Sequence, residues 1–142
     1  MLNSHFIGEI TEQKVAIEFL KIGILVSKPL VQCSRYDFII DVDNHLYKIQ
    51  VKTCSVKEDG SFLEFATSTS HTNTKGTKNL SYSKDDVDFF ATTYNDQCYL
   101  IPYERCGKRA QRLRLKPTQN GQTKGICFAK DYLLQDVIKE IK

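Results

Sequence analysis

Two runs of alternating apolar and polar residues lie between positions 35 and 53. They read Arg35-Tyr36-Asp37-Phe38-Ile39-Ile40-Asp41 and Tyr47-Lys48-Ile49-Gln50-Val51-Lys52-Thr53, separated by the polar pair Asp43-Asn44. β-Branched and aromatic residues at a period of two are typical of strands, and Asp and Asn are typical of tight turns. The pattern therefore predicts an antiparallel hairpin that turns at Asp43-Asn44.

This turn sets Asp37 opposite Gln50, Ile39 opposite Lys48 and Asp41 opposite Leu46. Because side chains alternate between the two faces of a strand, one face is apolar and belongs to the core: Phe38, Ile40, Val42, Tyr47, Ile49 and Val51. The other face is mostly polar: Asp37, Asp41, Lys48, Gln50 and Lys52. Cross-strand neighbours lie about 5 to 8 Å apart, so a carboxylate, an amide and an ammonium group converge there.

Helical periodicity is strongest at residues 9–22, where Val15, Ile17, Phe19, Leu20 and Ile22 form an apolar side and Gly23 ends the helix. A closing helix is predicted at 131–141. Strands are predicted at 24–26, 61–65 (as a third strand of the hairpin's sheet), 87–93, 97–101, 112–115 and 126–128. This order favours a single α/β or α+β domain over residues 1–142, with helices packed against one sheet.

Residues 66–84 interrupt the pattern because they are nearly all small and polar. Such a stretch has little apolar surface to bury, so the sequence predicts a long exposed loop inserted into the domain. Within it, Tyr82 beside Ser83-Lys84 has two interpretations, a packed core tyrosine or a ring that stacks on a nucleotide.

Composition narrows the class of protein. The chain has 142 residues, 41% hydrophobic and 26% charged, as expected of one globular domain. It shows neither a signal-peptide pattern nor an apolar run of about 20 residues, so we expect a cytoplasmic location and no membrane partner. Five cysteines without a C-x-x-C pair are expected to stay reduced and to form no zinc site.

Charge is unevenly spread. Residues 1–65 carry a net charge of −2 and residues 66–142 a net charge of +5. The excess is concentrated in a basic segment at 105–116: Arg105, Lys108, Arg109, Arg112, Arg114 and Lys116. A basic stripe suits a polyanion such as DNA; a solvated basic face is the alternative.

The polar face of the hairpin has ligands that magnesium prefers. Mg²⁺ takes oxygen ligands, usually one or two carboxylates together with water. Asp37 and Glu12 can supply carboxylates, and the Gln50 amide and the Val51 backbone carbonyl can supply neutral oxygens. Lys52 can then orient a water or stabilise charge on a phosphate. An exposed polar sheet face without chemistry is the alternative.

Several motifs together resemble the PD-(D/E)XK nuclease superfamily. They are Gly8-Glu9-Ile10-Thr11-Glu12, Tyr36-Asp37-Phe38-Ile39, Ile49-Gln50-Val51-Lys52-Thr53, Val87-Asp88-Phe89-Phe90 and Tyr99-Leu100-Ile101-Pro102. The resemblance spans about residues 7 to 103. It is strongest to the small group I intron homing endonucleases and more distant to archaeal Holliday-junction resolvases.

The resemblance implies a restriction-endonuclease-like core, a mixed central sheet flanked by helices. It also implies a catalytic set of Glu12, Asp37, Gln50 and Lys52, with Glu9 as an alternative to Glu12. Two positions depart from the common pattern: Tyr36 replaces the proline, and Gln50 replaces the acid of the (D/E)XK element. The homing-endonuclease branch uses a Q-x-K form, so Gln50 is compatible with activity.

The expected activity is that of a Mg²⁺-dependent DNA endonuclease, with Mn²⁺ able to substitute and no organic cofactor, that cuts both strands at a specific site. The alternatives are a structure-selective junction-resolving or repair nuclease, and a catalytically weak DNA-binding module. Double-stranded DNA is expected to contact Lys75, Lys78, Lys84, Arg105, Lys108, Arg109, Arg112, Arg114 and Lys116. Cutting both strands requires a homodimer or homotetramer.

Overall fold

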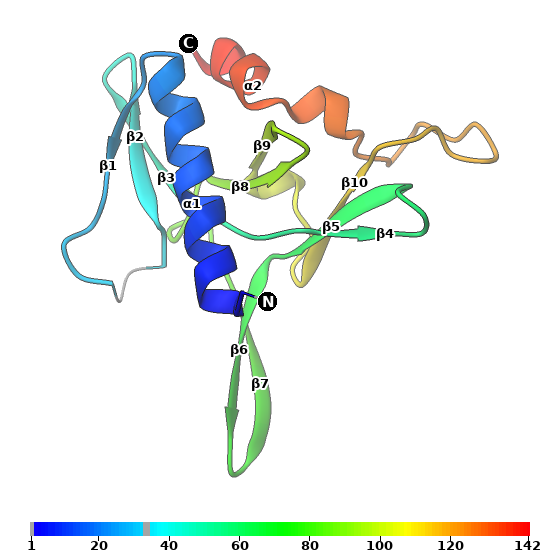
Figure 1. Ribbon diagram of the computed structural model, residues 1–142, viewed down its shortest axis with the longest axis horizontal. Coiled ribbons are helices and arrows are strands. Elements are labelled where there is room, and N and C mark those ends of the chain that lie inside the picture. Colours follow the sequence, from blue (N-terminus) through cyan, green and yellow to red (C-terminus); the bar gives the residue numbers. More distant parts are fainter. Residues whose placement is uncertain (1, 33–34) are drawn as a thin grey trace.

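A five-stranded sheet forms the centre of the computed structural model, which describes residues 2–32 and 35–142. Its strand order is β1-β2-β3-β8-β9, as Figure 1 shows. Strands β3 and β8 are parallel, and the other neighbours are antiparallel. The mixed central sheet predicted from the sequence is therefore confirmed, with these strands: β1 (Leu25–Ser27), β2 (Phe38–Val42), β3 (His45–Val51), β8 (Phe89–Tyr94) and β9 (Gln97–Pro102).

The β2–β3 hairpin has the predicted register, with Ile39 paired to Lys48 and Asp41 paired to Leu46. Asp43 and Asn44 have φ values of 50° and 67°, the left-handed pair that a two-residue hairpin turn requires. The Asn44 N–H donates to Asp41 Oδ1 at 3.0 Å. The turn residues and the apolar alternation thus fix which side chains reach the polar face.

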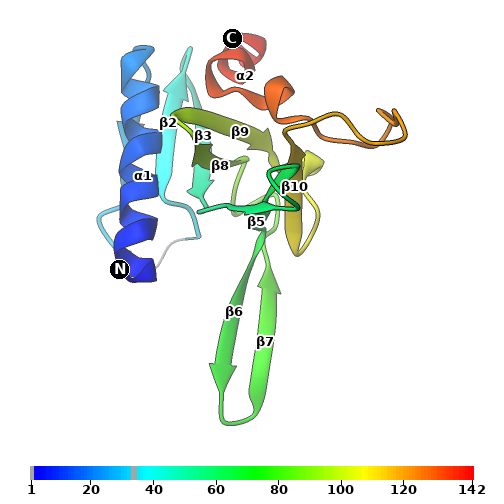
Figure 2. The same ribbon diagram turned by 45° about the vertical axis from the view of Figure 1, so that its right-hand side comes forward.

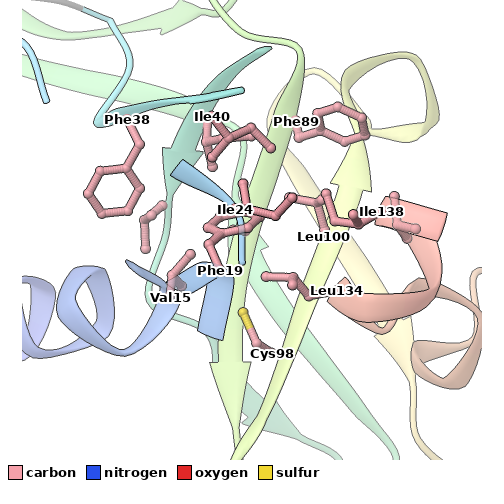
Figure 3. Close-up of a cluster of buried hydrophobic side chains, with 14 of the residues drawn as sticks. Val15, Phe19, Ile24, Phe38, Ile40, Phe89, Cys98, Leu100, Leu134 and Ile138 are labelled. Atoms are coloured by element: carbon pink, nitrogen blue, oxygen red, sulfur yellow. The ribbon is translucent and has the colours of Figure 1, made fainter. Parts of the chain in front are cut away.

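Helix α1 (Ser4–Lys21) packs on one face of this sheet. It begins five residues earlier than predicted because the Asn3 side chain accepts hydrogen bonds from the N–H groups of His5 and Phe6. The predicted closing helix is split into a 3₁₀ turn, η2 (Ala129–Tyr132), and helix α2 (Leu134–Ile141), which packs against β9. Figure 3 shows the core that both helices share with the sheet.

The apolar side predicted for α1 is partly wrong. Its buried residues are Thr11, Val15 and Phe19, whereas Ile17, Leu20 and Ile22 are exposed to 49%, 58% and 38%. Phe6 and Ile10 are also exposed. With Ile17 and Leu20 they are spaced four, seven and three residues apart, which places them on one side of the helix. Helix α1 therefore carries a second apolar row that points away from the core.

A second, three-stranded sheet covers the opposite face, in the order β10-β5-β4. Its strands are β4 (Ser55–Lys57), β5 (Phe62–Ala66) and β10 (Ala110–Arg114). The predicted strand at 61–65 therefore exists, but it belongs to this sheet and not to that of the hairpin. Leu63, Phe65 and Leu113 pack against Phe90 and Ile101 in a second core cluster. Strands β8 and β9 are consequently buried on both faces.

The predicted long loop is instead a second hairpin, formed by β6 (Ser68–Asn73) and β7 (Gly76–Ser81). Its ladder runs from the Ser68–Ser81 pair to the Asn73–Gly76 pair. Both views show it extending away from the rest of the molecule (Figures 1 and 2). Backbone pairing supplies order that the polar side chains alone did not indicate.

The remaining differences lie in the C-terminal third. The predicted strand at 126–128 is reduced to one bridge between Arg114 and Phe128. A 3₁₀ turn, η1 (Tyr103–Arg105), follows β9. Within the described residues, Cys54, Cys98, Cys106 and Cys127 are free thiols, as predicted, and no helix is long and apolar enough to cross a membrane. Cys33 lies outside the described residues.

Candidate active site

Two of the predicted carboxylates, Glu12 on α1 and Asp37 just before β2, line the same cleft. Its volume is about 280 Å³, and Glu9, Lys28 and Tyr36 also line it. Helix α1 is tied to the end of β3 by a hydrogen bond between Thr11 Oγ1 and Thr53 Oγ1, which are 3.1 Å apart. That contact brings Glu12, one residue farther along the helix, to the hairpin.

Asp37 is fixed at the cleft by the partner strand. Its N–H donates to the Ile49 carbonyl at 2.8 Å, and its Oδ2 accepts the Val51 N–H at 2.8 Å. Burial raises the pKa of Asp37 to about 6, and the Glu12 carboxylate adds to the rise. The Val51 hydrogen bond and the Lys52 and Lys28 ammonium groups oppose it. Burial therefore outweighs the nearby positive charges.

Gln50 and Val51 follow on β3. Both are at least partly buried, and the Gln50 Nε2 donates to the Val51 carbonyl at 3.4 Å. The side-chain amide thus lies beside the backbone carbonyl that was predicted as a metal ligand, and the amide oxygen of Gln50 is not used by this contact.

Lys52 comes directly after β3, where its N–H donates to the Ala91 carbonyl at 2.9 Å. Its ammonium lies 5.1 Å from the centre of the Tyr82 ring. Burial lowers the pKa of Lys52, the Arg35 guanidinium lowers it further, and Asp37 raises it. Asp37 therefore interacts electrostatically with both Glu12 and Lys52. The catalytic role of these residues stays a prediction.

Comparison with known proteins identifies the family of the chain. The sequence model described as PD-(D/E)XK endonuclease matches residues 2–135. The chain belongs to the PD-(D/E)XK endonuclease family. Membership implies an enzyme that hydrolyses phosphodiester bonds. The family and fold expected from the sequence are thus confirmed.

One solved structure has the same fold as this chain over nearly its whole length. It is a bacterial homing endonuclease, I-Ssp6803I, with a TM-score of 0.77 and 23% sequence identity. The match covers 98% of this chain and 95% of that one. No curated protein sequence matches the chain. At this identity the likeness establishes the architecture alone.

Two basic residues of the site escaped the sequence reasoning. Lys28, which follows β1, has its Nζ 3.2 Å from Glu12 Oε1. Arg35 lies over the Tyr82 ring at 4.1 Å. Nothing in the sequence near Lys28 indicates its contact with Glu12. Arg35, by contrast, lies two residues before Asp37, so strand alternation places both on one face and offers a signal.

The candidate donor atoms at this site fit a hard divalent cation. Within the described residues, no three His, Cys, Asp or Glu side chains gather into a metal-binding group. Two carboxylates, an amide and a backbone carbonyl remain, all of them oxygen donors that Mg²⁺ accepts. One oxygen of each carboxylate, Glu12 Oε1 and Asp37 Oδ2, already has a partner, and the second oxygen of each is left for a metal.

The predicted DNA-contacting residues fall into two groups. The first has intramolecular partners: Lys84 pairs with Asp88 and Glu104, Arg112 pairs with Glu64, Arg114 donates to the carbonyls of Lys116 and Pro117, and Lys116 donates to that of Asp59. The second group has no ion pair among the described residues: Lys75, Lys78, Arg105, Lys108 and Arg109. Lys75 lies at the tip of the β6–β7 hairpin and Lys78 lies on β7.

Proposed function

We propose that this family member is a Mg²⁺-dependent, site-specific DNA endonuclease. Its active site consists of Glu12 and Asp37, which line the cleft, together with Gln50 on β3 and Lys52 directly after it. The observation that carries the proposal is the convergence of Glu12 from α1 and Asp37 from the hairpin on one cleft, with the Lys52 ammonium acting on Asp37. Homing-type specificity is supported by the shared architecture with a homing endonuclease.

Each residue has a distinct role in this proposal. Glu12 and Asp37 would hold the metal through their second carboxylate oxygens, and the Gln50 amide and the Val51 carbonyl would add neutral oxygen ligands. Bound Mg²⁺ supplies a more acidic water and offsets charge on the phosphate, and Mn²⁺ can replace it. Lys52 lies beside Asp37 and stabilises the phosphate as negative charge develops there.

Double-stranded DNA is proposed to bind along the β6–β7 hairpin and residues 105–109. The two segments adjoin because the Thr67 N–H donates to the Arg109 carbonyl at 2.9 Å and Thr67 Oγ1 donates to the Gly107 carbonyl. Lys75 and Lys78 on one side and Arg105, Lys108 and Arg109 on the other then supply phosphate contacts. Lys84, Arg112, Arg114 and Lys116 contribute less, because each already has an intramolecular partner.

A second copy of the chain is proposed to complete the enzyme, because each chain has one site and cutting both strands of a duplex requires two. The exposed apolar row of α1 supports self-association, as a dimer or a tetramer of two dimers. Replacing Ile17 and Leu20 by Lys should lower the molar mass in sedimentation. Equal replacement of Leu25 and Val56, which are exposed elsewhere, is the matched control.

The proposal is tested by incubating the protein with a mixed DNA pool in Mg²⁺, Mn²⁺ or Ca²⁺. The pool contains plasmids with random inserts and synthetic four-way junctions. Lys52→Met should abolish cutting, whereas Lys48→Met, on the same face of β3 and bonded to the Asp85 carbonyl, should retain it. Cutting that survives in Lys52→Met would overturn the assignment of this site.

The same pool separates the two alternatives. Cutting confined to four-way junctions would indicate a structure-selective junction-resolving or repair nuclease. The neutral Gln50 in place of an acid is the feature that favours a catalytically weak DNA-binding module. That module would retain DNA in every metal without cutting it, equally in wild type and Lys52→Met.

A further inference from the structure

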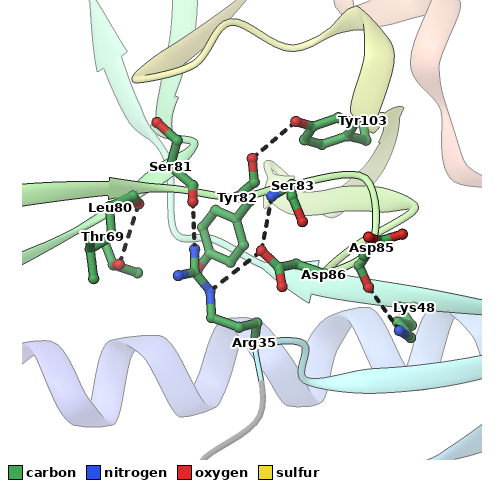
Figure 4. Close-up of polar contacts among 10 residues, drawn as sticks. All are labelled: Arg35, Lys48, Thr69, Leu80, Ser81, Tyr82, Ser83, Asp85, Asp86 and Tyr103. Carbon is green, nitrogen blue, oxygen red and sulfur yellow. Dashed lines mark hydrogen bonds and ion pairs between the residues drawn. The ribbon is translucent and has the colours of Figure 1, made fainter.

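Tyr82 connects the DNA-binding hairpin to the site of catalysis. It directly follows β7, and only 7% of its surface is exposed. Its ring contacts two cations: the Arg35 guanidinium lies 4.1 Å and the Lys52 ammonium 5.1 Å from the ring centre. Figure 4 shows the Arg35 side chain against the ring. The packed interpretation of Tyr82 is therefore right. The ring packs against Phe90 in the second core cluster, with ring centres 5.3 Å apart, and it also contacts these two charged groups.

Arg35 holds the end of the hairpin as well as the ring. Its Nη2 donates to the Ser81 carbonyl at 3.2 Å, and its Nε lies 3.9 Å from Asp86 Oδ2 (Figure 4). That Nε is buried without a hydrogen-bond partner in the described structure, so the stack on Tyr82 is a main contact of the guanidinium. On the other side, the Tyr103 hydroxyl donates to the Tyr82 carbonyl at 2.9 Å.

We propose that Tyr82 is a positioning residue that holds the Lys52 ammonium in place and, through Arg35, links that position to the seating of the β6–β7 hairpin on DNA. The inference rests on the proposed nuclease function. A lysine has a long flexible side chain, and an aromatic face restricts where its ammonium lies. Because Ser81 and Tyr82 are consecutive, a hairpin that shifts when it grips DNA also shifts the ring against Lys52.

The decisive comparison is between removing the ring and removing only its hydroxyl. Tyr82→Phe keeps the aromatic face and should cut the plasmid pool within about 2-fold of wild type. Tyr82→Leu should lower the single-turnover rate at saturating protein at least about 10-fold and leave the dissociation constant for the pool in Ca²⁺ within about 3-fold. Arg35→Met, at a half-buried position, removes the guanidinium that stacks on the Tyr82 ring and should lower the single-turnover rate in the same way.

A matched control is available on the second sheet, where Arg112 lies 4.6 Å from the centre of the buried Phe62 ring. Phe62→Leu removes a comparable cation–aromatic contact far from the hairpin end. It should lower the melting temperature about as much as Tyr82→Leu and leave the single-turnover rate unchanged. An equal rate loss in both variants would overturn the positioning role, because general destabilisation would then explain it.

Other outcomes also decide. A Tyr82→Leu rate equal to that of wild type, or a loss shared by Tyr82→Phe, contradicts the proposal. Weaker binding with an unchanged rate would make Tyr82 a DNA contact instead. If Tyr82→Leu does not fold, Arg35→Met gives the same test.

A second measurement does not depend on cutting. Fluorotyrosine NMR, with the Tyr82 signal assigned by Tyr82→Phe, should show that signal moving in Arg35→Met, in Lys52→Met and on addition of the plasmid pool in Ca²⁺. A Tyr82 signal that does not shift when DNA is added would refute the proposed coupling between Tyr82 and DNA binding by the β6–β7 hairpin. If the wild type never cuts DNA but the Tyr82 signal responds to all three changes, the coupling of Tyr82 to Arg35, Lys52 and the hairpin is supported and the nuclease assignment fails.

Discussion

The chain contains two antiparallel hairpins that differ in what holds them together. β2–β3 alternates apolar and polar side chains and buries Phe38, Ile40 and Ile49 completely. β6–β7 has Leu80 as its only large apolar residue, extends from the body and is held at its base by Thr67 and Arg35. An isolated polar hairpin is only marginally stable. The first hairpin is therefore a rigid scaffold for the proposed active site, and the second can move with the DNA that we propose it binds.

The largest effect is expected from Asp37→Asn, a substitution at the start of the β2–β3 hairpin. We expect the cleavage rate to fall by about 1,000-fold or more because a metal ligand is lost. Without metal and at about pH 7.5, the variant should be about 1 to 2 kcal/mol more stable in urea unfolding, because a buried charge is removed. Asp41→Asn, on the same strand face, is the control that should show neither effect on this scale.

The stability gain of Asp37→Asn should depend on pH with a definite sign. The folded pKa of Asp37, about 6, lies above its ordinary value of 3.8, so the stability that this group contributes is present below that ordinary value and is lost as pH rises through 6. In EDTA, the difference between wild type and Asp37→Asn should therefore vanish near pH 4. A constant difference across this range would contradict a buried, strained carboxylate.

The protruding hairpin can be shortened by replacing residues 70–79 with Asn-Gly. This pair forms a tight turn between Thr69 and Leu80, which are already paired. Because the core clusters lie elsewhere, the melting temperature should change by only a few degrees. DNA affinity should fall about 10- to 100-fold as phosphate contacts are lost. Unfolding of the whole domain by this deletion would show that the second hairpin also serves as scaffold.

Cleavage by the wild type should also fall as pH decreases through about 6, because protonated Asp37 no longer binds metal. Metal competes with the proton, so a higher Mg²⁺ concentration should move the midpoint to lower pH. Rate–pH profiles at two Mg²⁺ concentrations measure this shift. If the midpoint of the fall in rate at low pH does not change with Mg²⁺ concentration, a group other than Asp37 is responsible for that fall.

The smallest expected effect concerns single cations on the DNA-binding surface. Replacing both Lys75 and Lys78 by Ala should reduce the slope of log affinity against log salt by about 0.9 per lost contact. Replacing both Arg112 and Arg114 should reduce it less, because Glu64 and two backbone carbonyls already engage them. Salt titrations in Ca²⁺ compare the pairs, and equal slopes would place DNA on β10 as well.

The same contrast explains how far the sequence could be interpreted. The β2–β3 register was predictable because burial selects one face and Asp43-Asn44 fixes the turn. The β6–β7 ladder was not, because its polar strands give no burial signal. β5 was assigned to the wrong sheet because its partner β10 starts 44 residues after the end of β5, at Ala110. Lys28 meets Glu12, and Tyr82 meets Lys52, only through tertiary contacts, which no local pattern encodes.

A metal-dependent active site at Glu12 and Asp37 is tested by cutting of the random-insert plasmid pool by wild type and Asp37→Asn, side by side, in Mg²⁺ and in EDTA. We expect linear products with defined ends for wild type in Mg²⁺ alone, and none for Asp37→Asn despite unchanged retention of DNA. Equal cutting by both proteins, or cutting that persists in EDTA, would contradict a metal-dependent active site at Glu12 and Asp37.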